Sequence, residues 1–190
     1  RYDPANFFNT GSNVSNALSL STGNDKSQSY ISVATTNATG IMPNNDYDRY
    51  NFSFRNTTNF LNNKFILDTS ANYIIQNDKN MVSQGQYFNP LTSLYLFPRG
   101  EDFSDVAVYE RYDDLSGVNT QYWPYGDLGG VSSQNPYWIM NRMNRENDRR
   151  RYKLAASLQY NIIEGLNVQG RVSIDNTESK YTEKFHAGTV

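Results

Sequence analysis

The sequence predicts an all-β fold built as an antiparallel meander. Several segments alternate apolar and polar residues with a period of two, which is typical of strands that have one apolar face. The connections between them are rich in Gly, Asn and Asp, the residues that tight hairpins need for positive φ. The 190 residues include 15 Tyr and 10 Phe, an aromatic content that argues against disorder.

About six strands are expected. Two weaker candidates come first, at residues 14–21 and 29–37. Clear alternation follows at residues 50–55 and 65–75, and again at 152–160 and 166–174. Several of these segments run past the usual length of about 5–6 residues for globular strands.

The connections alternate strictly between short and long. Residues 22–26, 61–64 and 163–165 form short turns, whereas residues 38–46 and 78–147 form longer connections. All tight turns therefore fall at one end of the sheet and all long loops at the other, which is typical of transmembrane β-barrels. We interpret residues 1–190 as a partial barrel segment with a long extracellular loop at 78–147.

Aromatic residues are placed as two interfacial girdles would require. Phe60, Phe65 and Tyr160 lie beside short turns, and a second group lies about eight to ten residues away, near the long loops; it consists of Tyr50, Tyr73 and Tyr152. The residues predicted to face lipid are Tyr50, Phe52, Phe54, Leu67, Leu154, Leu158, Val168 and Val172. The residues predicted to face the lumen are Asn51, Arg55, Asp68, Asn72, Gln159, Arg171 and Asp175.

Six strands cannot close a membrane barrel, because such barrels have about eight strands or more. Open edges are not viable in lipid either, since each unpaired backbone group costs several kcal/mol. The segment must therefore belong to a larger barrel. The alternative is a soluble or surface-anchored carbohydrate-binding β-sandwich, whose strands also have one apolar and one polar face.

Composition argues against most enzyme and metal chemistry. The chain has no Cys, which excludes disulfides and thiolate zinc sites, and its one His, His186, makes a catalytic triad improbable. We expect no enzyme, no cofactor and no metal site. Loop carboxylates such as Glu101, Asp102 and Asp105, and the pair Asp113-Asp114, could bind a hard cation, but they lack EF-hand spacing and are interpreted as solvated.

The segment 141–151 is rich in arginine, but the formal net charge of −2 gives no steering toward nucleic acid. We expect these arginines at the outer rim of the barrel, paired with Glu146 and Asp148 or with lipopolysaccharide phosphates. No nucleic-acid partner is expected.

An ordered set of short motifs is informative where each single motif is weak. They are Phe7-Phe8-Asn9-Thr10-Gly11, Leu18-Ser19-Leu20-Ser21-Thr22-Gly23, Tyr30-Ile31-Ser32-Val33, Gly40-Ile41, Asp48-Arg49-Tyr50, Asn135-Pro136-Tyr137-Trp138, Glu164-Gly165-Leu166 and Gly170-Arg171-Val172-Ser173-Ile174-Asp175. In order and spacing this set resembles the SusC/RagA family of TonB-dependent outer-membrane transporters of Bacteroidetes. One departure is Ser21-Thr22-Gly23, where the family usually has a second Gly.

The resemblance implies a barrel of about 22 strands in the Gram-negative outer membrane, of the plugged-transporter size. It also implies import of oligosaccharides or peptides, energy from a TonB complex, and a SusD-like surface lipoprotein as lid. A family member would carry a signal peptide, a TonB box and an N-terminal plug. None of these is expected within this chain, so contact with TonB would run through other parts of the protein.

The long connection contains the residues that we predict as candidate substrate contacts: Tyr95, Trp123, Tyr125 and Trp138. Flat aromatic faces stack on the C–H surfaces of sugars, and neighbouring Asn and Asp can hydrogen-bond hydroxyls. The alternative is that these rings pack the loop onto itself or onto a partner lipoprotein.

Overall fold

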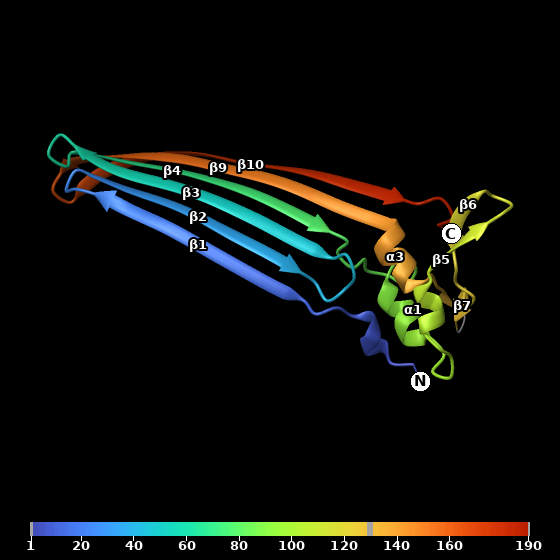
Figure 1. Ribbon diagram of the computed structural model, residues 1–190. Coiled ribbons are helices and arrows are strands. Elements are labelled where there is room, and N and C mark those ends of the chain that lie inside the picture. Colours follow the sequence, from blue (N-terminus) through green and yellow to red (C-terminus); the bar gives the residue numbers. More distant parts are fainter. Residues whose placement is uncertain (1, 129–130, 190) are drawn as a thin grey trace.

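The computed structural model describes residues 2–128 and 131–189, and its main feature is one long, curved antiparallel sheet (Figure 1). Six strands follow the order β1-β2-β3-β4-β9-β10. Their bounds are β1 Ser12–Gly23, β2 Ser27–Thr39, β3 Asp46–Phe60, β4 Phe65–Lys79, β9 Met143–Ile163 and β10 Leu166–Phe185. The predicted all-β meander and its six main strands are confirmed.

The strands are longer than predicted at the end of the long loops. Strand β4 continues to Lys79, and β9 begins at Met143 rather than near Tyr152. The charged run 143–151 has no apolar alternation to identify it, yet it pairs with β4 on one side and β10 on the other. The connection between the two strands therefore spans 80–142, a little shorter than the predicted 78–147.

The tight turns after β1, β3 and β9 lie together at one end of the sheet, and the longer connections lie at the other (Figure 1). The turn between β3 and β4 has positive φ at Leu61, Asn62 and Asn63, and the turn between β9 and β10 has positive φ at Gly165. The predicted alternation of short and long connections is confirmed.

The turns are also staggered along the strands. The end of the first hairpin, Gly23 opposite Gln28, is level with Thr57, whereas β3 runs on to Phe60. Phe60 is in turn level with Tyr160 through Phe65, and β9 runs on to Ile163. Each turn thus lies three residues beyond the previous one, from 57 to 60 and from 160 to 163.

Residues 80–142, which we call the cap, fold into a small unit of their own at the loop end (Figure 1). The cap contains helices α1 (Pro90–Leu96), α2 (Ser104–Ala107) and α3 (Pro136–Arg142), and the short hairpins β5–β6 (Glu110–Asp113, Val118–Gln121) and β7–β8 (Asp127–Leu128, Val131–Ser132). Helices α1 and α3 both begin with an Asn-Pro pair. Asn89 and Asn135 each accept a hydrogen bond from the backbone two residues on, and the proline that follows needs no N–H partner at the first helical position.

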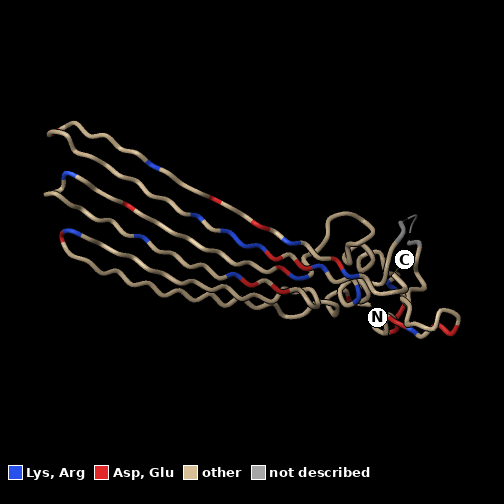
Figure 2. The backbone as a smooth tube through the Cα atoms, turned by 90° about the horizontal axis from the view of Figure 1, so that it is seen from above, with Lys and Arg blue, Asp and Glu red and all other residues tan. Residues whose placement is uncertain are grey.

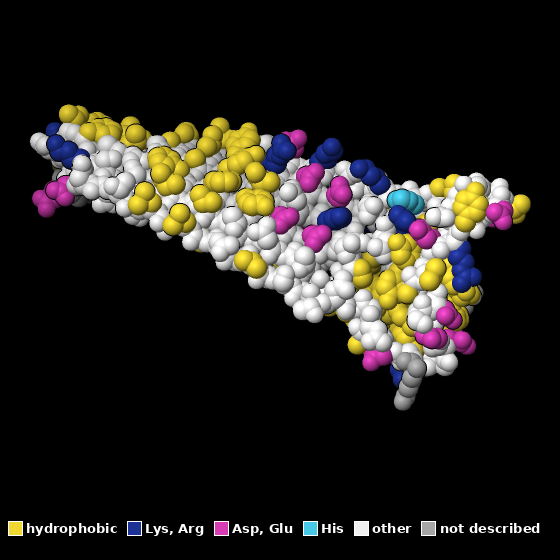
Figure 3. Space-filling model, in the orientation of Figure 1, with side chains coloured by type: hydrophobic (Ala, Val, Ile, Leu, Met, Phe, Trp, Pro, Cys, Tyr) yellow, Lys and Arg dark blue, Asp and Glu magenta, His cyan; other side chains and the backbone are white. Residues whose placement is uncertain are grey.

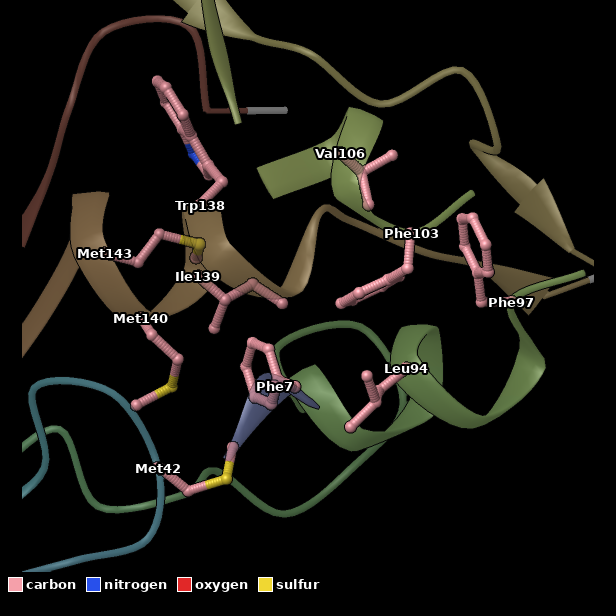
Figure 4. Close-up of a cluster of buried hydrophobic side chains, with 10 residues drawn as sticks. All are labelled: Phe7, Met42, Leu94, Phe97, Phe103, Val106, Trp138, Ile139, Met140 and Met143. Carbon is pink, nitrogen blue, oxygen red and sulfur yellow. The ribbon is translucent and has the colours of Figure 1, made fainter. Parts of the chain in front are cut away.

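The hydrophobic core of the described chain lies in and around the cap rather than under the sheet (Figure 4). Its buried side chains are Phe7, Met42, Leu94, Phe97, Phe103, Val106, Trp138, Ile139, Met140 and Met143. Phe7 comes from a 3-10 helix at Pro4–Phe7 that precedes β1, and Met42 from the connection between β2 and β3. Segments distant in sequence therefore meet in one cluster.

Polar contacts fix the cap to the sheet. The guanidinium of Arg145 lies 4.9 Å from the ring centre of Phe88 and 5.2 Å from that of Phe185, and its Nε donates to Glu183 at 2.8 Å. Asn80 accepts from the Arg145 backbone N–H at 2.9 Å and donates to the carbonyl of Asn44 at 3.1 Å. These contacts thus hold the cap at the ends of β4, β9 and β10 that lie opposite the tight turns.

We expect Trp138→Ala to loosen the cap without dissolving the sheet, because it leaves a large void in the cap core. The loss should be about 3–5 kcal/mol of local stability, seen as faster protease cleavage and faster hydrogen exchange within 80–142. The control is Tyr95→Ala, at an aromatic residue that is 65% exposed, which should cost less than about 0.5 kcal/mol. Equal effects of both changes would contradict the assignment of the core.

Candidate functional site

One face of the sheet is apolar across all six strands. The register aligns one row that runs through Leu20, Ile31, Phe54, Ala71, Leu154 and Ile174. These side chains are poorly covered, with Leu20 63%, Leu154 46% and Ile174 58% exposed. Within residues 2–128 and 131–189 no second sheet packs on this face. All the residues predicted to face lipid share it, so the predicted facing is confirmed, while contact with lipid stays a prediction.

Aromatic residues border this face at two levels. Near the tight turns, Phe60 stacks on Phe65 at 5.9 Å between ring centres and Phe65 stacks on Tyr160 at 4.7 Å. Toward the cap, Phe52, Tyr73 and Tyr152 are directly opposite one another on adjacent strands. Tyr50, which was predicted for this group, lies two residue pairs nearer the cap, opposite Ile75.

Beyond the second aromatic level the same face becomes charged. Its residues there include Asp48, Asp148, Arg150, Glu178 and Lys180. Figure 3 shows apolar side chains gathered over the sheet on the side of the tight turns, and charged ones between them and the cap. The apolar surface is therefore a band of limited height: from Tyr152 to Tyr160 it spans eight residue steps, or about 26 Å along the strand.

The opposite face of the sheet is polar. Arg55 and Asp68 form an ion pair at 2.7 Å, and the Asn72 amide donates to Asn51 at 2.9 Å and to Ser53 at 2.7 Å. The residues predicted to face the lumen all share this surface. Two hollows open on it, one of about 690 Å³ lined by residues that include Tyr30 and Thr57, and one of about 510 Å³ lined by residues that include Gln159 and Arg171.

The predicted pairing of the arginine run with Glu146 and Asp148 is wrong. Residues 143–151 are strand, so successive side chains point to opposite faces, and Glu146 and Asp148 lie across the sheet from Arg145, Arg149 and Arg151. Arg150 shares the face of Glu146 and Asp148, but among the described residues it forms no ion pair with either. Other partners replace them in the structure. Across the β9–β10 hairpin Arg145 binds Glu183 at 2.8 Å and Arg151 binds Asp175 at 2.6 Å, and within the cap Arg142 of α3 binds Glu110 of β5 at 2.7 Å.

The four predicted substrate contacts divide between the surface and the interior of the cap. Tyr95 is well exposed on α1. Trp123 and Tyr125 are half-buried and 5.4 Å apart between ring centres, and Tyr125 packs edge-on against Phe97 at 4.9 Å. Three of the four rings thus pack within the cap at least in part, as the alternative interpretation expected.

Trp138 is fully buried, and this position is inconsistent with direct substrate contact in the described fold. Helix α3 carries the Trp138 ring as part of the buried cluster (Figure 4). Its indole Nε1 donates to the Thr189 hydroxyl at 3.1 Å. A buried indole N–H needs such a partner. The sequence analysis placed Trp138 in a long loop and predicted no helix there, so it could not show that this ring points inward.

Asn135 is a structural residue that the sequence analysis named only as part of a family motif. Its side chain is fully buried and donates to the carbonyls of Val106 at 2.8 Å and Tyr122 at 2.9 Å, while its oxygen caps α3. One side chain therefore joins three parts of the cap. Its place before a proline predicts a helix start, but the two long-range contacts have no local signal.

Acidic residues of the cap are engaged in local turns. Asp102 accepts from the Ser104 N–H at 2.9 Å, and Asp113 accepts from the Ser116 N–H at 3.2 Å. These backbone and hydroxyl donors of Ser104 and Ser116 hold the pKa of each carboxyl below its usual value. Among the described residues, no group of three or more His, Cys, Asp or Glu side chains is arranged to hold a metal ion.

Comparison with known proteins adds no identity. No family model matches the chain, and no curated protein matches it. In the part of the chain that the structure describes, no helix has the length and apolar character needed to cross a bilayer.

The Glu110–Arg142 pair gives the cap a predictable pH dependence. Arg142 donates Nε and one terminal nitrogen to the two carboxylate oxygens, both at 2.7 Å, and these hydrogen bonds hold the pKa of Glu110 below its ordinary value of 4.5. Because the folded pKa is the lower one, the contribution of Glu110 is present above about pH 4.5 and is lost as the pH falls through the folded pKa. We expect the free energy of unfolding of the cap to fall by about 1 kcal/mol below about pH 4.5, measured as a loss of protease resistance.

Glu110→Gln should remove this acid dependence and lower cap stability at neutral pH to the acid level. Glu101→Gln, at a cap carboxylate with no ion pair among the described residues, is the control and should leave the dependence unchanged. An unchanged acid response in Glu110→Gln would assign it to another group.

Proposed function

We propose that the chain is a wall segment of a large outer-membrane β-barrel, and that the barrel is a TonB-dependent transporter of the SusC/RagA type. In this proposal it imports oligosaccharides or peptides with a SusD-like surface lipoprotein and a TonB complex. The observation that carries the proposal is the open apolar face, whose central row is unbroken across six strands.

The apolar face needs a cover. Apolar surface of this extent is unfavourable in water by about 25 cal/mol per Å², and a soluble sandwich would bury it under a second sheet. Among the described residues the core lies at the cap instead. A lipid bilayer supplies a cover that requires no further protein, and the band from Tyr152 to Tyr160 is nine residues long, which agrees with the about 9–11 residues that a tilted strand needs to span a bilayer.

The stagger of the tight turns agrees with a tilted barrel wall. Successive tight turns are two strands apart and are offset by three residues. This offset is about 10 Å along the strands, and two strand spacings are about 9.6 Å across them. If the turns lie at one rim of the membrane, the strands are tilted by about 45°, and transmembrane barrels have tilts of about 35–45°.

The free edges of the sheet also fit a wall segment. Strand β1 pairs only with β2 and strand β10 only with β9, so each edge leaves a row of backbone groups unpaired within the described chain. Such edges are costly in hydrocarbon. In the proposal, further strands of the same barrel pair with them.

The charged part of β9 and β10 lies between the apolar band and the cap and separates the two. From Tyr152 to Asn144 the strand continues for eight residue steps, again about 26 Å. This length of strand would place the cap outside the apolar band. Tyr95 and the half-buried Trp123 and Tyr125 would then lie in water, where an external solute or a lid protein approaches them.

A matched pair of substitutions on β10 tests the proposal. Ile174→Arg places a charge on the apolar band and should cost about 2–4 kcal/mol in a membrane, whereas Ser173→Arg, at the neighbouring exposed residue on the polar face, should be tolerated. The measurement is the folded fraction of the full-length protein in outer-membrane extracts, read as the form that migrates faster on SDS gels before boiling.

The wild-type full-length protein should need detergent for extraction and should show this heat-dependent migration. A protein that is released without detergent, migrates alike boiled and unboiled, and tolerates both arginines equally would favour the soluble β-sandwich and exclude the barrel.

A further inference from the structure

The two faces of the sheet differ in charge as well as in polarity. The polar face carries Arg49, Arg55, Arg145, Arg149, Arg151, Lys153 and Arg171 against Asp68, Asp78, Asp175 and Glu183, an excess of three positive charges. The other face carries one more carboxylate than cations, and the whole chain has a formal net charge of −2. The polar face is thus positively charged although the chain as a whole has a negative net charge.

The cations of the polar face extend from Arg149 near the cap, past Arg151 and Lys153, to Arg171 toward the tight turns. Figure 2 shows the positions of the Lys and Arg residues of both faces along the strands. Nearest the cap, Arg49 and Arg149 flank Gln76 in one row, so their backbones are about 9.6 Å apart. Among the described residues, Arg149 hydrogen-bonds only the Ser179 hydroxyl, at 3.3 Å. The nearby Asp78 accepts from the amides of Gln76 and Asn147 rather than from either guanidinium.

Two further groups repeat the same ratio of two cations to one carboxylate. In the middle, Asp175 binds Arg151 at 2.6 Å and Lys153 at 3.5 Å. Nearer the turns, Asp68 binds Arg55 at 2.7 Å, while Arg171 lies in the same row two strands away.

The three groups are evenly spaced. Along β10 they fall at Ser179, which is opposite Arg149, then at Asp175 and then at Arg171, four residues or about 13 Å apart each time. One carboxylate cannot neutralise two cations, so each group keeps about one positive charge for an incoming anion. A guanidinium also presents a planar fork of donors that suits carboxylate and sulfate oxygens.

The side chains between the groups are hydroxyls and amides. One row of the polar face reads Ser19, Ser32, Ser53 and Asn72 before it reaches Lys153 and Asp175. Such a surface can hydrogen-bond the hydroxyls of a sugar, and it offers few apolar contacts to the side chains of a peptide.

We propose that the polar face is a binding track for acidic oligosaccharides, that is, glycans with carboxylate or sulfate groups, which enter at Arg49 and Arg149. This inference rests on the proposed function, because it treats the polar face as the wall of a transport path. It narrows the substrate class beyond oligosaccharides or peptides in general.

The test uses the full-length protein in detergent and measures calorimetric binding of a hexamer of galacturonate, with its neutral methyl ester as the uncharged counterpart. The acidic hexamer should bind at least about tenfold tighter than the neutral one, and this difference should shrink as salt is added. Arg149→Gln should weaken the acidic hexamer about five- to tenfold and leave the neutral one unchanged, and Arg49→Gln with Arg149→Gln should weaken it further.

Arg150→Gln is the matched control, because Arg150 is the next residue of the same strand and is exposed on the opposite face. It should bind like the wild type. Equal affinity for acidic and neutral hexamers, binding of neither, binding of an acidic peptide alone, or equal losses in Arg149→Gln and Arg150→Gln would each overturn the inference. Heat-dependent migration of the same samples separates this result from failure of the barrel proposal, since a correctly inserted protein without charge preference contradicts only the track.

Discussion

The structure depends on one constraint, the two-residue period of side chains along a strand, kept in phase across six paired strands. The register places Phe54 beside Ile31 and Ala71, and it places Arg55 and Asp68 on the other surface. The apolar band, the aromatic levels and the line of cations all follow from this phase. A shift of one residue in any one strand would place polar side chains, and in β3, β4, β9 and β10 also charged ones, among the apolar side chains and break the row at that strand.

The position of the buried core in the cap rather than in the sheet follows from the same constraint. A sheet with two open faces has no interior of its own, so the buried core collects where the long connections meet. There the stability rests on a few side chains that join distant segments, above all Trp138 and Asn135, and on Arg145 between two aromatic rings. The cap and the sheet thus have different sources of stability, packing in the cap and backbone pairing in the sheet.

Much of this architecture could be predicted because its signals are local. Alternation identified the six strands, Gly and Asn identified the turns, and parity assigned residues such as Leu154 and Asp175 to their faces. Local patterns could not reveal the partners of the arginines, since Arg151 meets Asp175 across a hairpin. They could not show that Trp138 is buried either, because its environment is made by segments as distant as Phe7 and Thr189. Charged residues also hid the first part of β9, which is strand through pairing with both neighbours rather than through its own pattern.

The irregularity in the pairing at the start of β10 decides which side chains of that strand lie on each face of the sheet. The pairing shifts between Leu166 and Asn167, so that Ile162 is an extra residue on β9. Without this bulge Val168 would be opposite Asn161 instead of Tyr160, and the whole of β10 would be turned over. Because β10 offers twenty residues of free backbone edge, it acts as a template whose phase any strand added beyond it must copy. A single extra residue in one hairpin thus decides which face each side chain takes in any strand that pairs with that edge.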